Sequence, residues 1–587
     1  MRKHRLFLAG LCLALLGILV IPAIGQDVGP GEGAPVIKPN FGGDIATLNP
    51  ILAQDGPSND IINLIYPKFL EVSVDTALIT PGAAGSLVTD WEISDDGLVY
   101  TFKLRDDWFW TDGTQVTSAD IQYVWDAIQD NELQYNGNLQ DLKDKVVSVE
   151  SPDPQTVVIT FRVAACNAVD TAANIIPVPS HVFRELYGDN YAAMNESDAN
   201  LNPTVSAGRF SFLNFRPGEQ VTLVANQGYP DPVGGAVYPE GFIDRVVTDQ
   251  TVQVEQFLAG ELTYMPVPQG RQAELQERVD AGEFQGYATE RFNIRFVGLN
   301  TADPNNPQPG LDEDGNPIDQ GLHPLFGDVR VRQALNYGVD FDALNEGVYF
   351  GTGVPTPTHS GAANWVDISG IEPYPFDQEK ARALLEEAGW VDTDGDGIRE
   401  CRGCLYAQEV DPNFEGEPLA FELLTNAGNV SQEALGNVLV DLWGEIGFDV
   451  SFAPIDFNVL VDTFTGQQFD AVMIFWGFGF PEDPDGIRVT FGPENDLPGS
   501  GFNAVSYNNP RLNELLDTAL TLPGCDRAER EVLYQEAYQL LRDEVPWLWL
   551  GGGTGLVVAQ PNVQNFERRE THSLPNLWNV ENWIIVP

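Results

Sequence analysis

DWEISDDGLVYTFKLRDDWFWTDGTQVTSAD, residues Asp90–Asp120, is the stretch that decides most about the fold of this chain. Apolar and polar residues alternate over Leu98–Leu104, directly after an Asp95-Asp96-Gly97 turn, which predicts the second strand of a β-hairpin. A further turn at Thr111–Thr114 leads to Thr117-Ser118, where either side chain can cap the helix that begins next. The stretch therefore predicts a strand–strand–helix unit, and no pattern in it is typical of catalysis.

The start of the chain has the pattern of an export signal. Residues 1–5 are basic, an apolar run extends from Leu6 to about Ile21, and Ala23-Ile24-Gly25 fits a small-x-small cleavage site. These features predict a secretory signal peptide over residues 1–25 and a periplasmic or cell-surface location. The alternative is an uncleaved segment that tethers the protein to a membrane, although the apolar run is slightly short for a span.

The composition bounds the class of protein. Hydrophobic residues make up 43% of the chain, which is typical of a globular protein with a large core. The chain has 86 acidic and 31 basic residues and a formal net charge of −55. So negative a surface argues against binding to nucleic acid or to anionic membranes, because both need basic patches. We expect a solvated acidic surface.

Four cysteines follow the predicted signal peptide: Cys166, Cys401, Cys404 and Cys525. In an oxidising compartment Cys401 and Cys404 can close a short disulfide loop. A redox-active CxxC motif is the alternative, but no thioredoxin-like strand-to-helix context surrounds it. A zinc site would need further soft ligands nearby, and the sequence offers none. The pairing of Cys166 and Cys525 stays open.

Strand and helix patterns alternate along the chain after a Gly- and Pro-rich leader at 26–35. Asp328 and Asp377 each precede an amphipathic helix, and the second of these helices stops at Gly389. An apolar strand is predicted at Phe469–Trp476, before a Gly- and Pro-rich acidic loop. The alternation predicts α/β layers, whose strand order a single sequence does not give.

Several motifs, in order along the chain, resemble one family. They are Thr47-Leu48-Asn49-Pro50, the Asp90–Asp120 stretch, Asn202-Pro203 with Gly208-Arg209-Phe210, Asp328–Asp340, and Pro375–Trp390. Together they resemble the large solute-binding proteins of ABC importers of the dipeptide, oligopeptide and nickel type, known as family 5. The likeness covers nearly the whole chain after the leader, although Thr204–Ala207 departs from the glycines usual there.

The resemblance implies an α/β fold of the type II periplasmic-binding-protein class (cluster C-like), with two lobes, a hinge and an extra α/β domain. Lobe I would comprise 36–55, 206–291 and 551–587, the extra domain 56–205, and lobe II 292–550. A monomer would hold a peptide-like or oligosaccharide-like solute between the lobes and deliver it to a membrane permease. It would need no cofactor and would not be an enzyme.

The family places ligand contacts in an aromatic run near a tryptophan. The matching residues here, predicted to bind the solute, are Trp476, Gly477, Phe478, Gly479 and Phe480. Peptide-binding members carry an aspartate about three residues after that tryptophan, which pairs with the peptide's α-amino group. Gly479 and Phe480 occupy that place here, which argues against a free peptide bound in that mode. Packing in the core is the alternative for each phenylalanine.

Four further residues are predicted to contact the solute. Tyr135 resembles in position a tyrosine that reaches the ligand in peptide-binding relatives. Trp110 lies near a turn with Trp108, and core packing is the alternative for both. Trp365 and Asn503 are chosen for their aromatic and polar character in predicted loops of lobe II.

Residues 392–397, Asp-Thr-Asp-Gly-Asp-Gly, match the start of an EF-hand loop, with alternating aspartates and a glycine in sixth place. The twelfth position is Gly403 instead of the bidentate glutamate, although Glu400 offers a ninth-position ligand. We expect either a structural calcium site or a solvated acidic turn. The calcium ligands would be Asp392, Asp394, Asp396 and Glu400.

Two other function classes compete with solute import. A secreted hydrolase is disfavoured, because none of the five histidines (His4, His181, His323, His359 and His572) lies in a nucleophile-elbow or metal-ligand motif. A surface receptor that senses a solute and docks a signalling partner would use the same fold. The sequence names neither the solute nor the permease.

Overall fold

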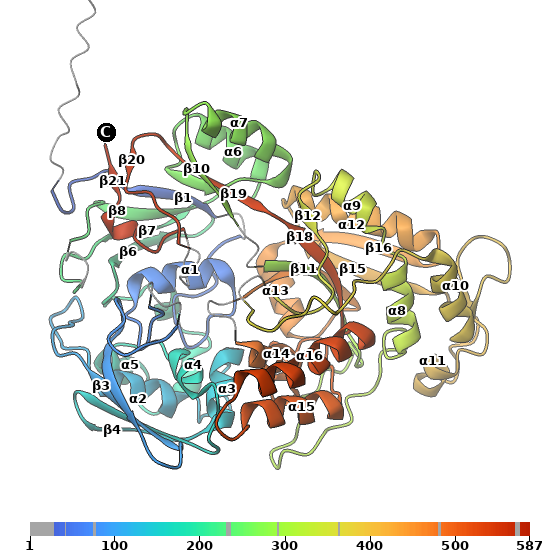
Figure 1. Cartoon of the computed structure of the whole chain (residues 1–587), viewed down its shortest axis with the longest axis horizontal. Helices are drawn as coiled ribbons and strands as arrows, with labels where there is room; N and C mark the ends of the chain where they lie inside the picture. The colour runs from blue at the N-terminus through green and yellow to red at the C-terminus, as the bar shows by residue number, and fades with distance from the viewer. Residues whose placement is uncertain are drawn as a thin grey trace, which may run out of the picture.

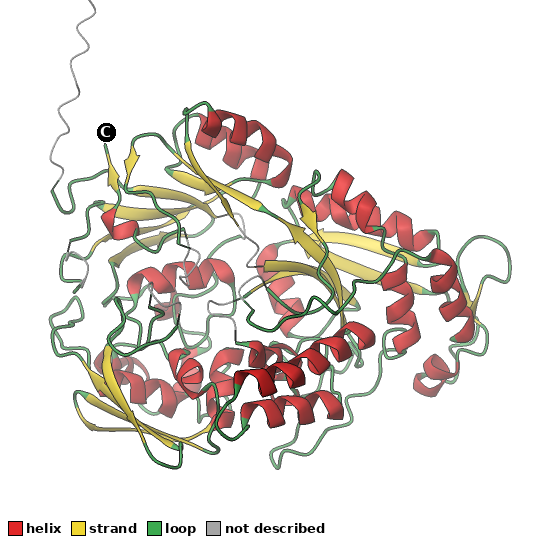
Figure 2. Ribbon diagram, in the orientation of Figure 1, coloured by secondary structure: helices red, strands yellow, loops and turns green. Residues whose placement is uncertain are grey.

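The computed structural model describes residues 29–40, 43–73, 78–230, 236–289, 293–361, 364–478, 483–569 and 576–586. The predicted signal peptide lies outside these ranges. Within them, no helix has the length and apolar character needed to cross a membrane. Helices and strands alternate through most of the chain, and Figures 1 and 2 show several separate sheets with helices packed on them. The predicted α/β class is confirmed.

Two sheets lie in the upper left of Figure 1 and combine segments far apart in the sequence. One is four-stranded, with β1 (Val36–Asn40) parallel to β8 (Gly241–Val246), followed by antiparallel β7 (Gln220–Ala225) and β6 (Phe210–Arg216). The other is antiparallel, in the order β10 (Gln285–Thr289), β19 (Gly555–Ala559) and β9 (Tyr264–Pro266). The helices of this region are α1 (Gly56–Ile65), α6 (Gln250–Leu258) and α7 (Gln272–Asp280).

A third sheet contains the hairpin predicted from Asp90–Asp120. It is antiparallel, in the order β2 (Val88–Ile93), β3 (Val99–Leu104), β5 (Thr156–Phe161) and β4 (Val146–Asp153). Its helices are α2 (Ser118–Ala127), α3 (Gly137–Lys145), α4 (Ala168–Ala173) and α5 (Ser180–Tyr187). Gly97, with φ of +72°, turns β2 into β3, and Thr117 with Asp120 forms a capping box at the start of α2. The predicted strand–strand–helix unit is confirmed.

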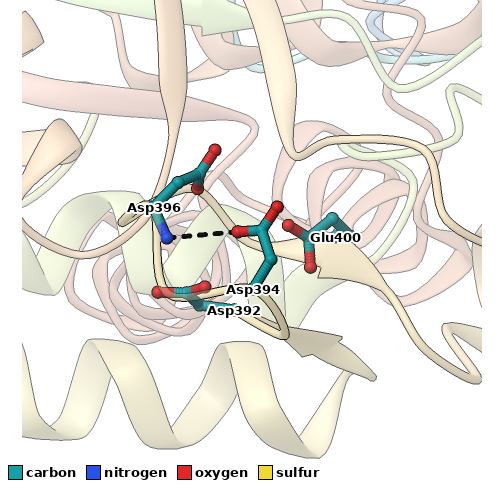
Figure 3. Close-up of side chains that lie close together, drawn as sticks. All are labelled: Asp392, Asp394, Asp396 and Glu400. Atoms are coloured by element: carbon teal, nitrogen blue, oxygen red, sulfur yellow. Dashed lines mark hydrogen bonds between the residues drawn. The ribbon is translucent and has the colours of Figure 1, made fainter.

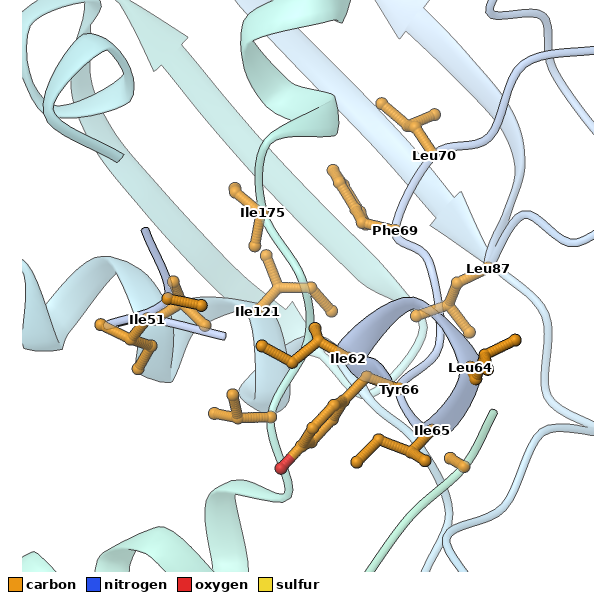
Figure 4. Packing of buried hydrophobic residues seen from close by; sticks show 14 of the residues in the cluster. Ile51, Ile62, Leu64, Ile65, Tyr66, Phe69, Leu70, Leu87, Ile121 and Ile175 are labelled. Atoms are coloured by element: carbon orange, nitrogen blue, oxygen red, sulfur yellow. The ribbon is translucent and has the colours of Figure 1, made fainter. Parts of the chain in front are cut away.

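One hydrophobic core joins this third sheet to the first. It contains Val36 and Phe242 from the first sheet and Phe102 and Val157 from the third. Figure 4 shows how Ile62 and Ile65 of α1 and the segment after it pack among side chains such as Ile121 and Ile175. Because a shared apolar core resists separation, we treat the described residues of 29–289 and 555–586 as the first unit.

The second unit, residues 293–553, is built on a six-stranded mixed sheet. The strand order is β12 (Gly353–Val354), β18 (Trp547–Gly553), β11 (Asn293–Leu299), β17 (Ala471–Gly477), β15 (Ala420–Asn426) and β16 (Asp449–Ile455). Its helices are α8 (Val329–Tyr337), α9 (Phe341–Gly347), α10 (Gln378–Glu387), α11 (Leu405–Val410), α12 (Val430–Gly444), α13 (Phe457–Thr465), α14 (Ile487–Phe491), α15 (Pro510–Leu520) and α16 (Arg527–Glu544).

Helices cover both faces of this sheet. One core holds α8, α10 and α12 against it, and a separate core holds α13, α14, α15 and α16. Asp328 caps α8 and Asp377 caps α10, as predicted from the sequence. The remaining short elements are β13 (Trp390–Val391), β14 (Glu400–Cys401), β20 (Val563–Gln564), β21 (Ile584–Ile585) and the 3-10 turns η1 (Tyr191–Met194), η2 (Asp198–Leu201), η3 (Gln269–Arg271), η4 (Pro484–Gly486), η5 (Pro493–Asn495) and η6 (Val580–Asn582).

The chain crosses between the units twice, once between β10 and β11 and once at Thr554 between β18 and β19. The two crossings lie side by side, because β10 pairs with β19 and β11 pairs with β18. A disulfide between Cys166 and Cys525, whose Cα atoms are 5.5 Å apart, also joins the units. Cys401 pairs with Cys404 within the second unit, with a Cα–Cα distance of 5.3 Å.

Candidate functional site

A cavity of about 790 Å³ lies between the two units. The first unit lines it with α1, α3 and α4 and the loop before α1, and the second unit with α13, the end of β17 and the segment around η4. Segments more than 300 residues apart, such as Gln54–Gly56 and Trp476–Phe478, therefore share one enclosure. Cavities of this size, with mixed apolar and polar walls, are typical of sites for organic ligands.

Aromatic side chains of the second unit form one wall. Trp476 is half-buried, and its ring centre lies 5.2 Å from that of Phe502 at an interplanar angle of 77°. Phe478 also lines the cavity, and Gly477 beside it is exposed. Three of the residues predicted from the aromatic run thus face one cavity. Gly479 and Phe480 lie outside the described residues.

His359 lies behind this wall and was not predicted as a site residue. It is 3% exposed, and its ring lies 5.0 Å from that of Phe478 and 5.3 Å from that of Trp547. Burial lowers the pKa of His359 to about 3, so the imidazole is neutral near neutral pH. Its Nε2 lies 3.3 Å from Thr490 Oγ1. His359 therefore supports the aromatic wall from behind as a neutral side chain.

Two buried lysines on the cavity wall are each held by two carboxylates. Lys38 contacts Asp60 and lies 3.4 Å from Asp244 Oδ1. Lys145 lies 2.9 Å from Asp141 Oδ1 and 2.8 Å from Asp485 Oδ2. Burial alone would lower the pKa of each lysine, but the neighbouring carboxylates outweigh it and raise the pKa above its usual value. Both lysines therefore stay charged, and each forms ion pairs with two carboxylates.

Comparison with known proteins identifies the chain. The sequence pattern of "Bacterial extracellular solute-binding proteins, family 5 Middle" matches residues 83–497. The chain is a member of this family. The oligopeptide-binding protein AppA of Bacillus subtilis is 24% identical over 563 residues, which cover 93% of this chain and 92% of AppA. The resemblance stated from the motifs is confirmed.

Solved structures show the same fold. The structure of Bacillus subtilis AppA in complex with a nonapeptide superposes with a TM-score of 0.79 at 21% identity and covers 95% of this chain and 100% of that one. The structure of NikZ from Campylobacter jejuni in complex with Ni(L-His) gives a TM-score of 0.74 at 22% identity and covers 94% and 99%. The family 5 protein described here therefore has the type II periplasmic-binding-protein fold.

Two predicted contact residues of the first unit do not line the cavity of this family 5 protein. Trp110 is 1% exposed, and its Nε1 donates to Asp120 Oδ2 at 3.1 Å, inside the core beside α2. Tyr135 is buried, and its hydroxyl donates to Gln140 Oε1 at 2.6 Å. Both side chains satisfy their polar atoms within their own unit, which is the core alternative weighed for Trp110.

The two predicted residues of the second unit also lie away from the cavity. Trp365 packs against the Arg527 guanidinium, 4.7 Å from the ring centre, and edge-on against Tyr534. Asn503 is fully buried, and its Nδ2 donates to the backbone oxygens of Gly492 and Tyr507. The residue types of Trp365 and Asn503 suit ligand binding, but packing and turn hydrogen bonds decide where the two side chains point. Phe502, next to Asn503 in the sequence, lines the cavity instead.

The predicted calcium ligands do gather in one place, as Figure 3 shows. Oxygen atoms of Asp392, Asp394 and Asp396, in the connection between β13 and β14, and of Glu400, the first residue of β14, lie within 4.8 Å of one another. Within the loop, Asp392 accepts from the backbone N–H of Gly395 at 2.7 Å, and Glu400 accepts from Thr393. Two short strands flank the loop in place of the two helices of an EF-hand. Calcium binding stays a prediction.

Proposed function

We propose that this protein captures an organic solute, peptide-like or oligosaccharide-like, in the cavity between its units and delivers it to the permease of an ABC importer. One observation carries the proposal. The cavity takes its lining from both units, which are connected by two adjacent main-chain crossings and by the Cys166–Cys525 disulfide. Two adjacent crossings form a hinge, so one unit can rotate toward the other and enclose a ligand within the range that the disulfide allows. The oligopeptide-binding name of AppA supports an organic solute.

The closing motion follows from the packing. We propose that the two sheets that share the first core move together, as lobe I (predicted as 36–55, 206–291 and 551–587) with the extra domain (predicted as 56–205). Residues 551–553 are an exception, because they end β18 of the second unit. The six-stranded sheet, lobe II (292–550), would move against lobe I and the extra domain. Closure would bring Trp476 toward α1 and α4, expel water from the cavity and present one joined surface to the permease.

We propose binding without chemistry on the solute. The relatives named above are binding proteins, whose task is to hold a ligand and release it unchanged. The neutral, buried His359 imidazole supports this, because it packs edge-on against Phe478 and is a weak base. We also propose that the protein works outside the cytoplasm, with residues 1–25 either removed or kept as a tether.

Exposure to a small-molecule extract of the native host tests the proposal. We expect solutes from the extract to raise the melting temperature of the full chain and to be recovered unchanged by mass spectrometry after denaturation. Trp476→Ala should weaken this response at least tenfold, and Phe376→Ala, at an exposed aromatic residue of the same unit, should leave it unchanged. Absence of any retained solute, or recovery of a chemically altered one, contradicts the proposal.

A further inference from the structure

The charges around the cavity are unbalanced. Among the described lining residues there are six aspartates and two lysines. Each lysine is already held by two carboxylates, as described above. The cavity therefore has no lysine left to bind an anionic group of a solute, because removing a buried lysine from its carboxylates leaves them unpaired.

Three of the six lining aspartates, Asp60, Asp141 and Asp485, hold the lysines, and Asp55 caps α1. Asp170 on α4 is one of the two that remain. It lines the cavity and has no ion pair or side-chain hydrogen bond within the described part of the chain. Burial, reinforced by the carboxylate of Asp483, raises the pKa of Asp170 to about 7. Asp483 also lines the cavity, and the Arg530 guanidinium lies 3.6 Å from its carboxylate. A carboxylate held in so low a dielectric gains strongly from a cation brought beside it.

Two amide side chains of the cavity wall add to this surplus of acceptors. Asn167, which is 6% exposed, donates its Nδ2 to Asp485 Oδ2 at 3.2 Å, and Gln54 donates its Nε2 to the backbone oxygen of Gly499 at 3.2 Å. Both hydrogen bonds bridge the two units. The side-chain oxygens, Asn167 Oδ1 and Gln54 Oε1, have no partner among the described residues. An unpartnered buried acceptor favours a ligand that donates.

Building on the proposed function, we propose that the solute is cationic, with an ammonium or guanidinium group that binds at Asp170 beside Asp483 and Asn167. The apolar part of the solute packs against Trp476 and Phe502. A cation fits both walls, because its N–H groups satisfy the free acceptors and because a positive group is attracted to aromatic faces. An anionic solute would add charge to a cavity that is already acidic, and a neutral solute would leave Asp170 unpaired.

This recognition differs from the α-amino contact expected in the peptide-binding mode. That contact would come from an aspartate after Trp476, where Gly479 stands. Asp170 belongs to α4 of the first unit, so the cationic group would bind on the wall provided by the first unit. A free carboxylate on the solute is not required, and a zwitterionic peptide would gain less than a net cation.

Charge fractionation of the host extract tests the proposal. The extract is separated at pH 7 on cation and anion exchangers, and the full chain is titrated with each fraction while its melting temperature is followed. We expect the stabilising solutes in the fraction that the cation exchanger retains. Equal or greater stabilisation by the anionic or neutral fraction overturns the cationic assignment and leaves the proposed function standing. No stabilisation by the whole extract overturns both.

Variants then test whether Asp170 binds the cationic group. With the cation-exchanger fraction as the probe, Asp170→Asn should raise the amount needed for half-maximal stabilisation at least tenfold, and Asp170→Glu should restore most of the response. Asp189→Asn, at an exposed aspartate of the same unit, should change it less than twofold. Circular dichroism and the melting temperature without solute establish that each variant is folded. An unchanged response of folded Asp170→Asn overturns the assignment of Asp170.

Discussion

Lys145 Nζ lies 2.8 Å from Asp485 Oδ2, and the two residues, 340 positions apart, belong to different units. Both side chains are buried at the cavity wall. Burial alone would raise the pKa of Asp485, but Lys145 and Arg488 outweigh it and hold the pKa below its usual value. The first unit and the second unit are thus joined by a buried charge pair that solvent screens only weakly.

Loss of this carboxylate should destabilise the protein markedly. Asp485→Asn leaves Lys145 and Arg488 with too little negative charge in a buried place, which costs about 3–5 kcal/mol of unfolding free energy. Asp517→Asn is the matched control, because Asp517 also bonds Arg488, at 2.9 Å, but is 70% exposed and should cost at most about 1 kcal/mol. Denaturant unfolding measures both variants. Equal losses for the two would contradict the role of burial.

Asp144 should make stability depend on pH. Burial, reinforced by the Glu494 carboxylate, raises the pKa of Asp144 from 3.8 to about 7. The folded state therefore binds a proton that the unfolded state releases between these values, so stability falls as pH rises from about 4 to about 7. Asp144→Asn removes this loss. We expect the variant to gain about 1 kcal/mol or more over the original protein at pH 8 and almost nothing at pH 4, measured by denaturant unfolding. A gain of the same size at both pH values would count against this assignment.

The two disulfides should differ in their effect on stability. Cys166 and Cys525 are 359 positions apart, whereas Cys401 and Cys404 are three apart. Because a cross-link restricts the unfolded chain more when it closes a longer loop, replacing both Cys166 and Cys525 by serine should cost about 3–5 kcal/mol. The same change at Cys401 and Cys404 should cost about 1–2 kcal/mol. Thermal unfolding of the two double variants makes the comparison. The reverse order would contradict the expectation.

Calcium should stabilise the protein weakly through residues 392–400. Without a bidentate glutamate in the twelfth position, we expect an affinity near the millimolar range and a gain of about 1 kcal/mol at about 10 mM calcium. The double change Asp394→Asn with Asp396→Asn should abolish the gain. The same change at Asp312 and Asp314, an acidic turn of similar sequence, should leave it in place. Melting temperatures with calcium and with a chelator give the answer, and an identical calcium response in both double variants would exclude the loop.

Local signals predicted the local structure well. The Gly97 turn and the helix caps at Thr117, Asp328 and Asp377 depend on residues a few positions apart, and the structure has all of them. The cavity wall at Trp476 followed from a family resemblance. Long-range relationships such as Lys145 with Asp485 have no sequence signature, because a buried charge pair depends on how the units pack.

Four predicted site residues lie away from the cavity: Trp110, Trp365 and Asn503, chosen for residue type and loop position, and Tyr135, chosen from the family resemblance. Trp110 and Asn503 have side chains that suit a ligand, but a hydrogen bond inside the core satisfies each of them. Asp170 and His359 were missed for the opposite reason. One aspartate among many, or a lone histidine, becomes informative only when its burial and neighbours are known.

The Cys166–Cys525 bond has a consequence for survival outside the cell. A single cut by a protease anywhere between these two cysteines, including the crossing between β10 and β11, would leave both fragments covalently linked. The nicked molecule would migrate as one species on a gel until a reductant is added. An exported protein with this bond can lose the continuity of its main chain without losing half of its binding site.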